Sequence, residues 1–167
     1  AAFDSAMHDG LPTSRAERGK YTSLRTLERH SFATSAVLLG PIDLASLADI
    51  PAPRIAFVNG RFDASLSDTA SLPEGVALRS LAHAMADGDS RDTAFLARRF
   101  ERTDETFAKL NAALAVDGAV LRVEENCAAT ATVHLVFVGA PAEADIAWHA
   151  RNLIELRRGA SLNVVEH

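Results

Sequence analysis

The stretch Asn152–His167, NLIELRRGASLNVVEH, decides the fold. Two β-type runs, Leu153–Leu156 and Leu162–Val165, flank a charged corner, Arg157-Arg158-Gly159, where glycine gives the backbone the freedom that a tight corner needs. So short an interval between two apolar runs is typical of a strand that bends at a corner of a coiled sheet. We therefore predict that the last run is an interior strand, and that the chain, which begins at Ala1, is a segment of a longer protein.

The sequence before this stretch continues the strand pattern back to residue 119. Three further short β-type runs are predicted: Val120–Val123, Val133–Val138 and Ile146–His149. Many short strands with changing corners indicate a coiled sheet or solenoid, although no clean repeat is visible. Residues 119–167 are the third of three predicted parts.

The second part, residues 54–118, is predicted to be a small α/β region. Ile55–Asn59 has a strand pattern, Asn59-Gly60 is a strong hairpin signal, and Arg61-Phe62 begins the return strand. A strand, a helix, a polar loop and a long helix are expected next: Val76–Leu78, Ser80–Ala86, Asp87–Asp92 and Ala94–Val116. Five apolar residues would share one side of the long helix: Leu96, Phe100, Phe107, Leu110 and Leu114. Asp117-Gly118 would end it in a left-handed cap.

The first part, residues 1–53, is predicted to be helical. Ser14 and Glu17 have the spacing of a capping box, and three residues follow with helical spacing: Tyr21, Leu24 and Leu27. Leu44–Ala48 is expected to form one short helix. Ile50–Pro53 is expected to be a linker, because each proline disfavours helix in the residue before it.

Composition excludes several classes of protein. The chain has 167 residues, of which 48% are hydrophobic and 23% charged, as in a globular protein, and its net charge of −5 argues against a general nucleic-acid binder. The single cysteine permits no intrachain disulfide and indicates a reducing compartment. No apolar run has the length of a membrane span, and the first ten residues do not resemble a signal peptide. We expect a cytoplasmic protein.

The histidines give little support for a metal site. There are six of them: His8, His30, His83, His134, His149 and His167. No two have the spacing of a ligand pair on a helix. The last three lie on separate predicted strands and could stack on one face of a coil, but ordinary surface or interface histidines are the favoured interpretation. Beside Trp148, His149 is expected to make an aromatic contact at a turn.

Two other groups of residues have a structural interpretation. Cys127 follows Glu124-Glu125-Asn126, where nearby carboxylates reduce the nucleophilicity of a thiol. Without a second cysteine it cannot anchor an iron–sulfur cluster alone. It is expected to be a half-buried small residue. Arg98, Arg99 and Arg102 are interpreted as a solvent-exposed helix face with ion pairs to nearby carboxylates.

Sequence motifs of catalysis are missing. Gly19-Lys20 lacks the following Ser/Thr and the earlier glycine of a phosphate loop, and no serine lies in G-x-S-x-G. Glu124 and Glu125 are adjacent, so in a strand they would face opposite sides. We therefore expect a protein that is not an enzyme and has no catalytic, cofactor-binding or metal-binding residue in this segment.

Ordered blocks of sequence resemble the SufB/SufD family of the SUF iron–sulfur cluster assembly system. They are Gly10-Leu11-Pro12-Thr13, Glu17, Lys20-Tyr21-Thr22 and Leu24; Phe57 to Phe62; Phe107, Leu110 to Ala112 and Asp117-Gly118; Val133 to Leu135; and Leu153 through Gly159-Ala160 to His167. The Gly-Leu-Pro-Thr and Lys-Tyr-Thr blocks favour the SufD branch. The resemblance covers nearly the whole chain but only the N-terminal portion of the family.

The resemblance implies an α+β fold in which N-terminal helices and a small α/β region lead into the first turns of a right-handed parallel β-helix. It also implies a non-catalytic scaffold that works with SufB-like subunits and the SufC ATPase, with the residues of cluster assembly beyond His167. Two alternatives stay open: a β-helix protein acting on carbohydrate, and a transporter-associated subunit. The uncovered end of the truncated coil is expected to self-associate or fray.

Overall fold

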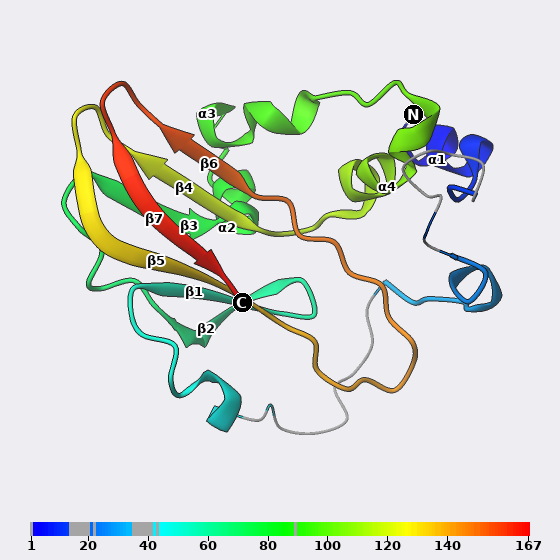
Figure 1. Cartoon of the computed structure of the whole chain (residues 1–167), viewed down its shortest axis with the longest axis horizontal. Helices are drawn as coiled ribbons and strands as arrows, with labels where there is room; N and C mark the ends of the chain where they lie inside the picture. Colours follow the sequence, from blue (N-terminus) through cyan, green and yellow to red (C-terminus); the bar gives the residue numbers. More distant parts are fainter. Residues whose placement is uncertain (1, 14–20, 22, 35–41, 43, 89) are drawn as a thin grey trace.

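A computed structural model describes residues 2–13, 21, 23–34, 42, 44–88 and 90–167. The fold is mixed α+β, with two sheets on one side and the pair α1 and α4 on the other (Figure 1). The strands are β1 Arg54–Val58, β2 Arg61–Asp68, β3 Val76–Ser80, β4 Ala119–Val123, β5 Ala128–Val138, β6 Leu153–Leu156 and β7 Ser161–Glu166. The α-helices are α1 Ala2–Asp9, α2 Leu81–Ala86, α3 Ser90–Thr93 and α4 Thr106–Leu114. The 3-10 helices are η2 Leu27–Arg29, η3 Leu44–Leu47, η4 Ala94–Ala97 and η5 Thr103–Glu105. The α+β prediction is confirmed.

The hairpin β1–β2 forms where the sequence predicts it. Asn59 and Gly60 connect the strands with φ angles of 47° and 77°, the left-handed region that asparagine and glycine tolerate best. Phe57 then lies opposite Phe62, and their rings contact edge to face at 6.3 Å.

The C-terminal strands wind through both sheets. The sheet orders are β2-β1-β5-β7 and β3-β4-β6, and β6 pairs parallel with β4 while β7 pairs parallel with β5. The chain therefore passes from the smaller sheet to the larger one, returns, and repeats the same passage beside the first. Contacts between the two passages join residues 33 positions apart.

The core lies between the two sheets. The buried residues that form it come from both sides: Ile55, Phe57, Leu78, Ala119, Leu121, Val133 and Leu135. Burial of such a large apolar side chain contributes about 1.5–3 kcal/mol, so this seam is the main source of stability. Because β1 pairs with β5, the second and third predicted parts share this core.

The corners of the two passages stack on each other. Asn126 and Gly159 occupy corresponding positions with φ angles of 60° and 71°, and the Asn126 N–H donates to the Arg158 carbonyl at 2.9 Å. Arg157 and Arg158 form ion pairs with Glu124 and Glu125 respectively. The charged corner predicted from the sequence is confirmed, whereas Glu124 and Glu125 lie in a turn and not in a strand.

The predicted long helix over Ala94–Val116 is wrong. The chain forms η4, an extended segment, η5 and then α4, because Arg98 and Arg102 take extended backbone angles. The Arg102 N–H donates to the Glu105 side chain at 3.2 Å, which starts a new helix there. Leu96 consequently packs against the cluster of Leu81, Ala84 and Val120, while α4 packs against α1.

Other predicted elements also differ. Asp87–Asp92 contains part of α3, Ile146–His149 forms only an isolated bridge from Ile146 to Ala33, and Gly118 has no positive φ. In the N-terminal part, residues 23–29 form turns and η2, and Tyr21 is exposed, so the predicted helical stripe does not form there. Its capping residues Ser14 and Glu17, together with Gly19-Lys20, lie outside the described residues.

A buried charge network holds α3 against the outer face of the smaller sheet. Asp92 of α3 binds both Arg79 of β3 and Arg122 of β4, and Arg122 also binds Glu155 of β6. Burial disfavours the charged carboxylate, but the hydrogen bonds from Arg122 and Arg79 hold the pKa of Asp92 below its usual value. The network therefore ties three neighbouring strands to one helix.

Candidate functional site

The candidate site, called the open end below, is formed by β6 and β7, the last strands of the two sheets. Both are edge strands, and within the described residues neither pairs on its outer side. Ile154 and Leu156 are 46% and 45% exposed, although their neighbours in β4, Leu121 and Val123, are buried in the core. The apolar seam between the sheets thus reaches the surface at this end.

This end has the features of a surface that accepts an added strand. An edge strand offers backbone N–H and C=O groups to an added strand, and apolar side chains behind it can be covered by the next layer. Leu162 and Val164 of β7 are only partly buried against the core and belong to the same uncovered seam. The arrangement fits the addition of strands.

Two of the three histidines on predicted strands come together. His134 of β5 and His167, which follows β7, stack with ring centroids 5.1 Å apart and join Nδ1 to Nε2 at 2.8 Å. Burial and then the neighbouring His167 lower the pKa of His134. His149 lies elsewhere, beside Trp148, so two of the three histidines that could have stacked on one face come together.

An aromatic contact is predicted for His149, but among the described residues the ring contact at this corner is made by Trp148. Trp148 stacks on Phe137 with centroids 6.4 Å apart. Burial lowers the pKa of His149, which lines a cavity of about 250 Å³ together with Trp148. His30 pairs with Asp145 at 3.0 Å, and His83 contacts the Phe62 ring.

Cys127 is free and half-buried, as expected, and its thiol donates to the Glu74 carbonyl at 3.3 Å. Across the described part of the chain, no three His, Cys, Asp or Glu side chains are grouped so that they could hold a metal ion. None of the helices in that part is long and apolar enough to cross a membrane.

Sequence reasoning missed Asp117, a buried carboxylate at the meeting point of three elements. Its oxygens accept N–H groups of Phe62 and Ala82 at 2.9 Å and of Gly118 at 2.8 Å. The hairpin, α2 and the start of β4 are therefore held by one side chain. The signals in the sequence were its position before a glycine at the end of an expected helix and its place in one of the family-like blocks.

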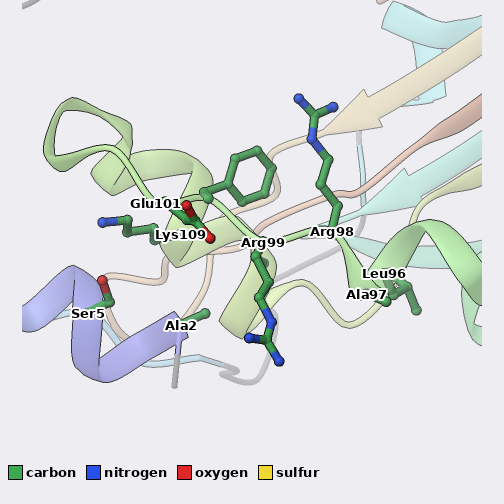
Figure 2. A pocket seen from close by; sticks show the side chains of 10 residues that line it. Ala2, Ser5, Leu96, Ala97, Arg98, Arg99, Glu101 and Lys109 are labelled. Carbon is green, nitrogen blue, oxygen red and sulfur yellow. The ribbon is translucent and has the colours of Figure 1, made fainter.

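The basic residues predicted on a helix lie instead on the extended segment between η4 and η5. Arg102 pairs with Asp104, and the Arg98 guanidinium lies over the Phe100 ring at 5.2 Å. Arg98 and Arg99 line a cavity of about 560 Å³ beside α1 and α4, together with residues such as Ser5, Glu101 and Lys109 (Figure 2). The predicted helical ion pairs are therefore absent from this described segment.

Comparison with known proteins identifies the family. The model of the SufBD protein N-terminal region matches residues 1–135. The chain is similar to an iron–sulfur cluster assembly SufBD family protein of Synechocystis sp., with 26% identity over 161 residues, 93% of this chain and 35% of that protein. It thus spans about a third of the length of this curated relative. On the extent of the family match, the chain belongs to the SufBD family, as its sequence blocks indicate.

Proposed function

We propose that the protein is a SufD-like, non-catalytic scaffold subunit of iron–sulfur cluster assembly that works in the cytoplasm with SufB-like and SufC-like subunits. Family membership and the assembly function named for the Synechocystis relative support the pathway. The Gly10–Thr13 and Lys20–Thr22 blocks support the SufD branch.

One observation carries the scaffold role: the parallel stacking of β6 on β4 and of β7 on β5, with an open apolar end. Repeated stacking of this kind is how a solenoid grows, so further turns of a right-handed β-helix would cover Ile154 and Leu156. A structure built in this way offers long surfaces to partner subunits.

The test is co-purification of the whole natural protein. We expect it to bring down SufB and SufC, and a matched sample to release no sugar from polysaccharide. Failure to recover either subunit under conditions where authentic SufB and SufC associate would contradict the proposal. Sugar release would favour the carbohydrate-active alternative, and co-purification with a membrane permease in place of SufB would favour the transporter-associated one.

The 167-residue chain itself is expected not to recruit SufC, because the family resemblance places that contact on later helices. Calorimetry of the chain with SufC should therefore give no saturable heat. A tight complex would show that the contact lies within these residues and that the division of roles is wrong.

The same chain should self-associate or fray through its open end. Light scattering over a concentration series should show a rising mass, and Ile154→Asp should reduce it, because a carboxylate in the exposed seam opposes apolar contact. Met85→Asp, at an exposed apolar site on α2, is the matched control. A monomer at every concentration with strongly protected amides in 160–167 would contradict the open coil.

A further inference from the structure

Two arginines lie together beside the larger cavity without a carboxylate partner. Arg151, 8% exposed, has its guanidinium over the Phe95 and Phe100 rings at 5.4 and 6.0 Å, and Arg98 lies over the same Phe100 ring at 5.2 Å. One phenyl ring thus contacts two cations.

The polar contacts of this pair leave its positive charge uncompensated. Arg151 donates to the Phe95 carbonyl at 3.0 Å, and the ion pairs of the described residues include no carboxylate for Arg98 or for Arg151. Buried charges are ordinarily paired, so a buried arginine beside a second arginine is an exception that calls for an anion.

The charges also affect each other. Burial and then the positive charge of Arg98 lower the pKa of Arg151. An anion that bridges the two guanidiniums would relieve this repulsion. Planar guanidiniums hold the oxygens of phosphates and carboxylates in pairs, which suits them to this task better than lysines.

The larger cavity lies next to Arg98. Arg98 and Phe100 line it and Arg151 does not, and the rest of its wall is mixed, with apolar residues such as Ala2 and Leu96 and polar ones such as Ser5 and Glu101. Lys109, the other cation of the wall besides Arg99, is already paired with Asp9. The side chains of Arg98 and Arg99 point in opposite directions (Figure 2).

We propose that Arg98 and Arg151, which share the Phe100 ring, form a binding site for the phosphate or carboxylate group of a small organic anion. This site is independent of the open end and of the scaffold role. Phenyl rings on either side hold the guanidiniums in place before the ligand arrives, which lowers the entropic cost of binding.

Calorimetry on the whole natural protein at low ionic strength tests the site, with inorganic pyrophosphate and citrate as the phosphate and carboxylate probes. We expect one equivalent of at least one probe to bind with a dissociation constant below about 1 mM. The probe that binds more tightly identifies the anionic group. No saturable binding of either probe would overturn the proposal.

Variants separate this pair from general positive charge. Arg98→Gln should weaken binding about tenfold or more, because it removes charge-assisted hydrogen bonds, whereas Arg99→Gln should change it by less than about threefold. Both residues are exposed, so neither change should unfold the protein, and circular dichroism checks this. Unchanged binding by Arg98→Gln, or an equal loss in Arg99→Gln, would refute the site.

Discussion

Substitution of Gly118 by alanine tests the closest approach between the two passages of the chain. A Cβ at Gly118 would lie 2.2 Å from the Arg151 carbonyl oxygen and 2.8 Å from its nitrogen. The Arg151 N–H donates to the Asp117 carbonyl at 3.0 Å at the same point, so the two backbones are held together there. Carbon and oxygen atoms without a covalent link ordinarily stay more than about 3.3 Å apart.

The expected cost is large because the obstacle is backbone. A methyl group must displace the Arg151 backbone by about 1 Å, which breaks the parallel bridge from Asp117 to Ala150 and disturbs the entry into β6. Overpacking typically costs about 1–3 kcal/mol, and occasionally more where no side chain can yield. We therefore expect Gly118→Ala to lower the free energy of unfolding by about 3 kcal/mol or more.

Gly139→Ala is the matched control. A Cβ there meets no atom within 4 Å, and the residue has no positive φ. Its substitution should be neutral or stabilise by up to about 1 kcal/mol through the unfolded state. Denaturant titrations, followed by fluorescence of the single tryptophan, Trp148, measure both variants. Stability of Gly118→Ala within about 1 kcal/mol of the control would refute this contact and, with it, the pairing of β4 with β6.

Three further predictions concern individual side chains and the chain's binding properties. Asp117→Asn should lower the free energy of unfolding by about 2–3 kcal/mol, because an amide NH₂ replaces an oxygen that accepts a backbone N–H. The control Asp63→Asn should lower it by less than about 1 kcal/mol, because only Oδ1 of Asp63 accepts hydrogen bonds and the amide can keep that oxygen. Denaturant titration compares the two variants. The pKa of His134 in the folded protein lies below its ordinary value of 6.5, so the unfolded state binds more protons. The free energy of unfolding should therefore fall as the pH decreases through and below 6.5. His134→Gln should weaken this dependence, and an unchanged pH slope would show that His134 does not cause it. Anaerobic treatment of the chain with iron and sulfide should leave no cluster absorbance, and ATP should give no heat of binding; a stoichiometric, chelator-resistant cluster would contradict the first expectation.

Local signals predicted most of the strands, although β5 begins at Ala128, before the predicted run Val133–Val138, and Ile146–His149 forms no strand. Asn59-Gly60 located the hairpin, and the apolar runs located β4, β6 and β7 to within a residue or so. These features depend on neighbours in sequence, where turn chemistry and alternation act directly. The long helix failed for the opposite reason: Phe95 and Phe100 contact Arg151, about fifty residues away, and helical periodicity alone gave no sign of that contact.

The two candidate sites differ in the same way, since one depends on a local sequence pattern and the other on a contact between distant residues. The open end could be inferred from Leu153–Leu156 and Leu162–Val165, because their pattern is local. The pair Arg98 and Arg151 could not, since each residue alone looks like an ordinary surface cation. Only the fold places both on one phenyl ring.

The register of the coil depends on two features that act together. A slip of one residue between β4 and β6 would turn Ile154 and Leu156 away from the core, so alternation excludes it. A slip of two keeps the faces but moves Gly159 off Asn126, and a Cβ in that place would lie 2.6 Å from the Asn126 side-chain oxygen. The exposed ion pairs from Arg157 and Arg158 contribute only about 0–1 kcal/mol each and reinforce this choice. The glycine and the alternating pattern therefore act together to fix how β6 lies on β4.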